Sequence, residues 1–249
     1  LIEPSTFTQV HFAKCEPVVM DTRFNSSVTD IFRNEYLSPR SPYTTLQIPK
    51  QGIGEWCHPL HTVDINDAGL RSSVQNGILN TELGIPFRTP AEGHNVAFTS
   101  LWDNYPDSLE IPLKGKASRA YLLMAGSTNH MQCHIDNGVI RIYYKDGTRD
   151  VMFLRNPDNW PPIEHIFFED GLAFNRHTPA LYRLRLKTGE ISNNFGEELG
   201  FPGASRELDG GAAVLLEMPL NPGKKLSHLV LETLSNDVVI GLMSITLQR

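Results

Sequence analysis

The stretch 102–105 combines two aromatic rings with two short polar side chains: Trp102, Asp103, Asn104 and Tyr105. An aromatic face can cover the apolar side of a pyranose ring, and carboxylate and amide groups can bond its hydroxyls. The same residues before a proline are also typical of a tight corner between strands, where polar side chains bond local backbone. We favour the corner, because buried aromatic residues usually serve packing, and keep sugar binding as the alternative.

The segment 156–170 is the densest grouping of acidic, imidazole and aromatic side chains, and it contains Trp160, Glu164 and His165. A glycosidase needs two carboxyl groups about 5 to 10 Å apart across the scissile bond, so Glu164 is a catalytic candidate. Trp160 and Trp56 are further aromatic candidates for stacking on a sugar.

A polysaccharide lyase would use a different set of residues in the same region. Its histidine, tyrosine and arginine would neutralise a uronate and move its proton, and the candidates are His165, Tyr182, and Arg183 or Arg185. The alternative, which we favour, is that these acids and arginines pair on a solvated face. We therefore expect no catalysis by this chain on its own.

Metal binding has two weak candidates in the sequence. His58 and His61 form a His-x-x-His pair beside Cys57, which could begin a zinc site, but Pro59 separates them and we expect a loop. The stretch 64–69 (DINDAG) is rich in oxygen ligands and could hold a structural calcium ion, although it lacks the pattern of an EF-hand loop. No phosphate-binding loop, dinucleotide fingerprint or serine-nucleophile motif occurs, so we expect no cofactor.

Composition excludes several classes of partner. The chain has 249 residues with 22 Lys plus Arg, 28 Asp plus Glu and a formal charge of −6, which makes nucleic acid a poor partner. Its longest apolar runs are shorter than the roughly 20 residues of a spanning helix, so we expect no membrane span. The opening LIEPSTF is not a leader, and we expect a removed signal peptide or a preceding part of a longer protein.

The elements that must position these residues are short strands. Alternating segments at 137–157 and 180–192 predict two hairpins, the first with Asp146 and Gly147 in a two-residue turn. Nearly continuous apolar runs in 210–249 predict three strands covered on both faces. Three more are expected within 94–101, 107–113 and 117–126, whereas helical spacing is confined to 28–37, behind Ser26 and Ser27 as cap residues.

These elements predict an all-β fold, a two-sheet antiparallel β-sandwich of jelly-roll type with little helix. Residues 51–249 are expected to form the sandwich domain. The more irregular residues 1–50 are expected to be an N-terminal arm along the sandwich or the end of a preceding domain.

A succession of motifs between residues 46 and 170 resembles an uncharacterised bacterial family of β-sandwich regions. These motifs are LQIPKQGIGEWCHP, GIPFRTP, NVAFTSLWDNYPDSLEIPLKGKASRAYLLMAGSTNHMQ, YYKDGT and NPDNWPPIEHIFFED, and the likeness extends to LETLSNDVVIGLMSITL. Members of this family occur alone or as the C-terminal region of large polysaccharide-degrading glycoside hydrolases. The motifs are also similar to carbohydrate-binding-like jelly rolls. The resemblance implies a secreted or periplasmic protein of carbohydrate metabolism, and it transfers no catalytic residues.

Three functions follow as expectations. The first is a non-catalytic module of a bacterial carbohydrate-processing system, which binds a polysaccharide or oligosaccharide weakly or supports a catalytic domain of the same longer protein. The second is a stand-alone glycosidase or polysaccharide lyase with its own groove. The third is a structural protein-interaction domain.

Overall fold

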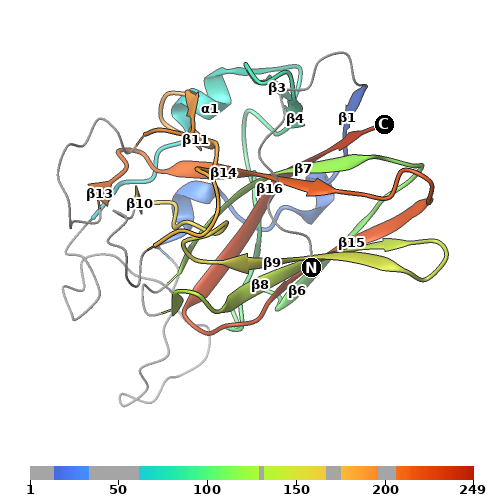
Figure 1. Ribbon diagram of the computed structural model, residues 1–249. Coiled ribbons are helices and arrows are strands. Elements are labelled where there is room, and N and C mark those ends of the chain that lie inside the picture. Colours follow the sequence, from blue (N-terminus) through green and yellow to red (C-terminus); the bar gives the residue numbers. More distant parts are fainter. Residues whose placement is uncertain (1–13, 34–61, 129–131, 167–174, 196–205) are drawn as a thin grey trace.

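The computed structural model describes residues 14–33, 62–128, 132–166, 175–195 and 206–249, which form an all-β, sandwich-like fold with antiparallel pairing between its strands (Figure 1). The larger sheet has the order β1-β16-β7-β14-β11-β12, with β5 also paired to β16. Its strands are β1 (Cys15–Pro17), β5 (Ala97–Thr99), β7 (Arg119–Thr128), β11 (Arg183–Arg185), β12 (Ile191–Ser192), β14 (Ala212–Pro219) and β16 (Val238–Gln248).

The second layer is a four-stranded sheet with the order β6-β15-β8-β9. Its strands are β6 (Ser108–Pro112), β8 (Asp136–Tyr144), β9 (Arg149–Arg155) and β15 (Leu226–Thr233). A smaller sheet joins β2 (Val74–Gln75), β3 (Ile78–Asn80) and β4 (Pro86–Arg88), and β10 (His165–Ile166) pairs with β13 (Arg206–Glu207). All-β architecture was therefore predicted correctly from alternation and turn residues.

The main core lies between the two large sheets. Alternate side chains of each strand point to one face, so Leu122 and Met124 of β7 meet Ile140 of β8 and Leu229 of β15 in one buried cluster. Burying a side chain of this size contributes about 1.5 to 3 kcal/mol relative to leaving it in water. The residues between them, such as Leu123, point to the opposite face of the larger sheet.

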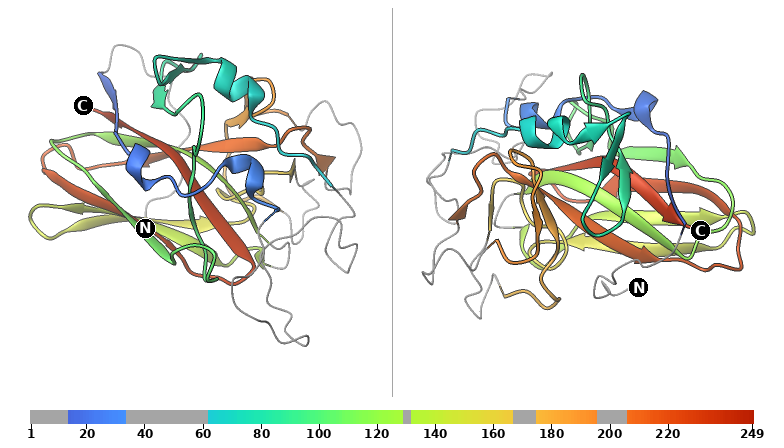
Figure 2. Two further views of the ribbon diagram at one scale, coloured as in Figure 1. Left: turned by 180° about the vertical axis from the view of Figure 1, so that it is seen from behind. Right: turned by 90° about the horizontal axis from the view of Figure 1, so that it is seen from above.

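A second core covers that opposite face. Leu123 of β7 and Leu215 of β14 pack there with Val28 and Ile31 of the N-terminal segment and Leu70 of the helix α1 (Ala68–Ser72). Figure 2 shows the N-terminal segment, α1 and β2–β4 along this side of the sheet. The larger sheet is therefore buried on both faces, which explains its nearly continuous apolar strands and confirms the prediction for β14 and β16 within 210–249. The third strand predicted there, β15, belongs to the four-stranded sheet and is only partly buried on its outer face.

Both predicted hairpins are confirmed, with one correction to a turn. β8 pairs with β9, and β11 pairs with β12. The amide of Tyr144 donates to the carbonyl of Thr148, so three residues, not two, form the first loop. Gly147 has φ +83°, whereas the φ of Asp146 is not positive. The turn is therefore not the predicted two-residue turn. A glycine at the third loop position lets the strands twist without splaying.

The helix expected at 28–37 is only partly found. Val28–Asp30 forms a short 3-10 helix, η2, and residues 34–37 lie outside the described residues. Ser27 occupies the N-cap position without a capping side-chain bond. The carboxamide oxygen of Asn95 instead accepts the Val28 amide proton at 3.0 Å, so a distant loop replaces the local cap that we expected from Ser26 and Ser27.

The stretch 64–69 leads into α1. Side-chain oxygen atoms of this stretch accept hydrogen bonds from other groups of the protein. Asn66 Oδ1 accepts the Ala68 amide proton at 2.9 Å, which is the local turn that starts the helix. Asp67 is buried and binds Arg71 at 2.9 Å and the Asn95 amide at 2.8 Å. Asp64 is exposed over 87% of its side chain. Asn66 and Asp67 therefore bond protein groups, whereas Asp64 faces solvent.

The described part of the N-terminal arm packs on the sandwich. β1 pairs with the end of β16, and Met20 enters the main core close to the 3-10 helix η1 (Asp21–Arg23). The domain boundary at residues 50 and 51 falls outside the described residues and stays a prediction. In the part of the chain that the structure describes, no helix has the length and apolar character needed to cross a membrane.

Candidate functional site

The stretch 102–105, here named the 102–105 corner, connects β5 to β6. The amide of Ser100 donates to the carbonyl of Pro106 at 3.0 Å, which closes the loop, and the Trp102 amide donates to Ser100 Oγ at 3.1 Å. These local bonds are those of a strand-to-strand corner, so the geometry agrees with the interpretation that we favoured.

The side chains of this corner divide between core and solvent. Trp102 and Tyr105 are half-buried and pack against the second core, where the rings of Tyr105 and Phe98 lie 5.2 Å apart. Asp103 is exposed and Asn104 is half-buried. The corner therefore holds two anchored, partly accessible aromatic rings beside one solvent-facing carboxylate, which is a combination that can contact a sugar.

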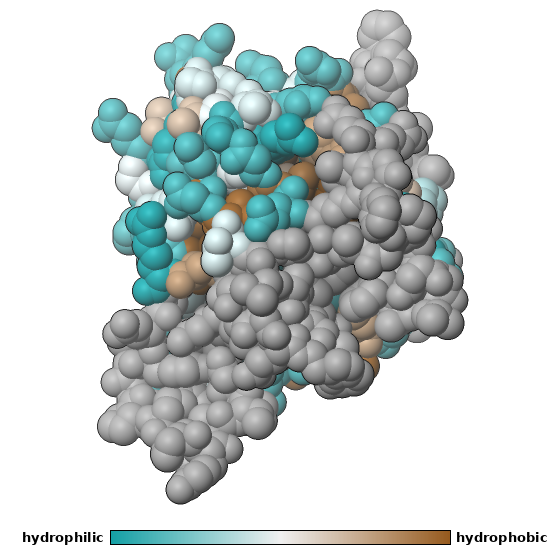
Figure 3. All heavy atoms as spheres, turned by 90° about the vertical axis from the view of Figure 1, so that its left-hand side faces the viewer, coloured by the Kyte–Doolittle hydropathy of each residue, from teal (hydrophilic) through white to brown (hydrophobic). Residues whose placement is uncertain are grey.

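Exposed hydrophobic side chains lie at the same end of the sandwich. Thr99, at the end of β5, bonds through its hydroxyl to Thr233, at the end of β15, at 2.8 Å, and the Leu234 amide donates to the Asn137 carbonyl. The large hydrophobic residues exposed here are Leu101 (42%), Ile135 (46%) and Leu234 (36%). Figure 3 shows the left-hand side of the molecule in Figure 1, on which some hydrophobic side chains are visible between hydrophilic ones.

Trp160 is a core residue, which corrects its prediction as a sugar-binding aromatic. Its exposed fraction is 0%, and its ring lies against Gly126 of β7, where an added Cβ would come within 2.5 Å of the ring. No ring face of Trp160 is available to a ligand. Trp56, the other predicted aromatic, lies outside the described residues, as do Cys57, His58 and His61.

Glu164 is also buried, which corrects its candidacy as a surface catalytic acid. The hydroxyl of Ser127 donates to its two carboxylate oxygens at 2.8 and 3.0 Å. The Arg183 guanidinium is buried as well and donates to the carbonyls of Pro162 and Ala212. Burial lowers the pKa of Arg183 to about 10, and the nearby negative charge of Glu164 opposes that shift. This network is internal and does not face a substrate.

Of the arginines predicted for a lyase, Arg183 is not at the surface. Arg183 points into the interior, Tyr182 is half-buried against the second core, and Arg185 lies over the ring of Phe195 at 4.6 Å. His165 is in β10, paired with Glu207. A uronate needs an accessible guanidinium, and Arg183 does not provide one.

The solvent face of the four-stranded sheet carries aromatic residues with covered rings. Tyr143 of β8 stacks on His228 of β15 with ring centroids 4.6 Å apart. From β9, on the other side, Arg149 lies over the Tyr143 ring at 5.7 Å. Both neighbours occupy ring faces of Tyr143, so this pair is a poor platform for stacking a sugar.

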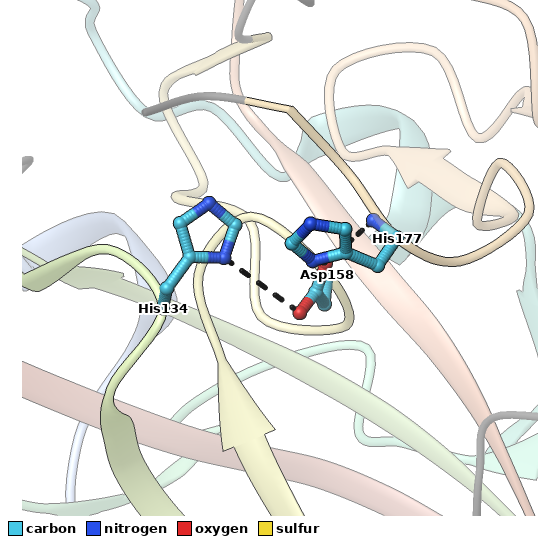
Figure 4. Close-up of side chains that lie close together, drawn as sticks. All are labelled: His134, Asp158 and His177. Carbon is cyan, nitrogen blue, oxygen red and sulfur yellow. Dashed lines mark hydrogen bonds and ion pairs between the residues drawn. The ribbon is translucent and has the colours of Figure 1, made fainter. Parts of the chain in front are cut away.

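Sequence reasoning missed a cluster of His134, Asp158 and His177 (Figure 4). Their candidate ligand atoms all lie within 4.8 Å of one another. His134 precedes β8, Asp158 follows β9 and His177 belongs to a third segment, so no local spacing motif connects them. The predicted hairpin at 137–157 could have placed His134 near Asp158, but nothing in the sequence pointed to His177.

No protein-family model matches the chain, and a search of curated proteins found no match. The family resemblance drawn from the motifs is therefore a prediction, and the function must be argued from the site.

Proposed function

We propose that this protein is a non-catalytic β-sandwich module of a bacterial carbohydrate-processing system, secreted or periplasmic, which binds glycan weakly at the 102–105 corner. The observation that carries this proposal is the combination at that corner of anchored, partly accessible Trp102 and Tyr105 with the exposed carboxylate of Asp103. Rings that are already fixed by packing lose little conformational entropy when a sugar covers them. The small accessible area accounts for weak binding.

We also propose that the sandwich is of jelly-roll type, and the strand connectivity supports this. Along the chain, β5, β7, β14 and β16 belong to the larger sheet, whereas β6, β8, β9 and β15 belong to the smaller one. The resulting orders, β5-β16-β7-β14 and β6-β15-β8-β9, are those of two interleaved Greek keys.

Glycan binding is tested by affinity electrophoresis of the full chain in gels that contain plant or host polysaccharides, with reducing-sugar release measured in parallel. We expect retardation by at least one polysaccharide without product release. Trp102→Ala should weaken this retardation about tenfold, because loss of one stacked ring costs about 1 to 2 kcal/mol.

The matched control is Tyr143→Ala, since the faces of that ring are already occupied by His228 and Arg149. Circular dichroism and thermal unfolding of both variants exclude a loss of fold. Equal retardation of Trp102→Ala and wild type, or no retardation by any polysaccharide, would refute binding at this corner. Product release by the wild type would favour the stand-alone enzyme instead.

Support of a catalytic domain is a second candidate role, favoured by the exposed Leu101, Ile135 and Leu234 at one end of the sandwich. Exposed apolar side chains that gather in one region are typical of surfaces that contact another domain. Addition in trans of a glycoside hydrolase catalytic domain from the same longer protein should protect this end from hydrogen exchange. Unchanged exchange at these residues would argue against the supporting role.

A further inference from the structure

We propose that His134, Asp158 and His177 bind a divalent transition-metal ion such as Zn²⁺. The three side chains come from separate segments that meet beyond the ends of β8 and β9 (Figure 4). Two imidazoles and one carboxylate are a common donor set for such ions. The inference does not depend on the proposed glycan binding.

The three candidate ligand atoms lie within 4.8 Å of one another and would have to draw closer to hold an ion. Nδ1 of His177 lies 3.4 Å from Asp158 Oδ1, and Nδ1 of His134 lies 3.9 Å from Asp158 Oδ2. Two ligand atoms at about 2.1 Å from a tetrahedral zinc ion are about 3.4 Å apart. The first distance fits that value, and the second requires a movement of about half an ångström. Both exceed the usual length of a direct hydrogen bond, so the rings and the carboxylate do not satisfy each other.

Hydrogen bonds from the backbone and from Thr178 fix the positions of Asp158, His177 and His134 relative to one another. The His177 amide donates to Asp158 Oδ1 at 2.8 Å, and the Thr178 hydroxyl donates to the Asp158 carbonyl at 2.6 Å. The His134 amide donates to the Asn156 carbonyl at 2.7 Å, next to the bridge between Cys133 and Asn156. A ligand set that is already ordered loses less entropy when the ion binds.

The three side chains of the cluster differ in exposure, and this difference would allow an ion to enter from solvent. The exposed fraction of the side chain is 15% for Asp158, 31% for His134 and 63% for His177. The partly buried carboxylate of Asp158 supplies the negative charge, and the exposed imidazole of His177 leaves a path for the ion. Three protein ligands also leave a fourth position for water or for an oxygen atom of a ligand.

The donor set selects among ions. Calcium prefers six to eight oxygen ligands, whereas this cluster offers two nitrogen atoms and one carboxylate. Imidazole nitrogen suits zinc, copper, nickel and iron. A bound ion would tie together the segments around residues 134, 158 and 177, so its main consequence would be to stabilise this end of the sandwich.

The test is calorimetric titration of the full chain, freed of affinity tags and of metal, with ZnCl₂ and separately with CaCl₂. We expect zinc to bind and to raise Tm by about 5 to 10 °C at a hundredfold excess over Kd, and calcium to have no effect. His177→Ala and Asp158→Asn should each weaken zinc binding about tenfold or more. Cobalt substitution should give visible absorption bands that these variants lose.

The matched control is His94→Ala, because His94 is exposed and lies outside the cluster; it should bind zinc as the wild type does. His177→Ala is the decisive variant, since its largely exposed side chain can be removed without disturbing the core. Thermal unfolding in EDTA confirms the fold of each variant. Absence of zinc binding up to about 1 mM, or wild-type affinity in His177→Ala and Asp158→Asn, would overturn the proposal.

Discussion

Trp160 and Gly126 form a close contact between a ring and a strand. An added Cβ at Gly126 would lie 2.5 Å from the Trp160 ring and 2.1 Å from the carbonyl oxygen of Val239. The second neighbour is backbone of the adjacent strand β16 and cannot move aside as a flexible side chain can. Glycine is therefore needed at this position because of space, even though it lies within a strand that glycine ordinarily weakens.

Gly126→Ala should lower the free energy of unfolding by about 3 kcal/mol, because one extra methyl group must displace a strand or a fully buried ring. Urea unfolding followed by tryptophan fluorescence measures this change. Gly223→Ala is the matched control, since its added Cβ meets only the Asn221 side chain at 3.2 Å, and it should change stability by less than about 1 kcal/mol. Equal effects of the two substitutions would contradict the proposed contact.

Tyr144 joins two turns at the other end of the four-stranded sheet. Its hydroxyl donates to Asp150 and accepts the amide proton of Asn221 at 2.8 Å, while Lys224 lies 5.6 Å from its ring centre. The β8–β9 hairpin and the β14–β15 connection are thus held by one side chain. Burial, followed by the bond to Asp150, raises the pKa of Tyr144 to about 12.

Because of this raised pKa, the contribution of Tyr144 to the free energy of unfolding decreases at alkaline pH. The unfolded tyrosine loses its proton near pH 10, whereas the folded protein retains it to about 12, so the contribution of Tyr144 is complete below pH about 10. It is lost as the pH rises through about 12. The free energy of unfolding of the wild type should therefore fall between about pH 8 and pH 12. In Tyr144→Phe this fall should be smaller by about 1 to 2 kcal/mol, a figure that allows for partial solvent screening. Guanidinium unfolding at both pH values measures it, and an undiminished difference in the variant would show that Tyr144 does not contribute.

At the scale of the whole molecule, the N-terminal arm and α1 are fastened to the sandwich through Asn95. This residue has no exposed surface; its side-chain oxygen accepts the Val28 amide proton, and its side-chain amide donates to Asp67. A single buried amide therefore links the segment 14–33, the helix and the loop before β5. The second core depends on this link, because Val28 and Leu70 cover the larger sheet.

Asn95→Ala should lower the free energy of unfolding by about 3 kcal/mol, because two buried groups lose their partner. Limited proteolysis should also cut the segment 14–33 faster than in the wild type. The exposed Asn193 provides the control, and Asn193→Ala should leave both measurements unchanged. A stability loss without faster cleavage of this segment would mean that Asn95 does not hold the arm.

The sequence by itself determined the strands, most turns and the shortage of helix. Alternation assigned Ile140 and Ile142 to one face of β8, and the apolar runs of β14 and β16 indicated strands buried on both sides. These features depend on neighbours a few residues apart, so periodicity and glycine position suffice to predict them.

Only the tertiary structure decided which polar and aromatic residues face solvent. Trp160 and Glu164 lie in a segment whose composition suggested a surface site, yet both are buried, because the loop after β9 folds back across β7. The β8–β9 hairpin brings His134 near Asp158, whereas His177 reaches them only through the path of a segment farther along the chain. Such long-range contacts leave no local pattern, because strand order and loop paths, not residue spacing, bring these side chains into contact.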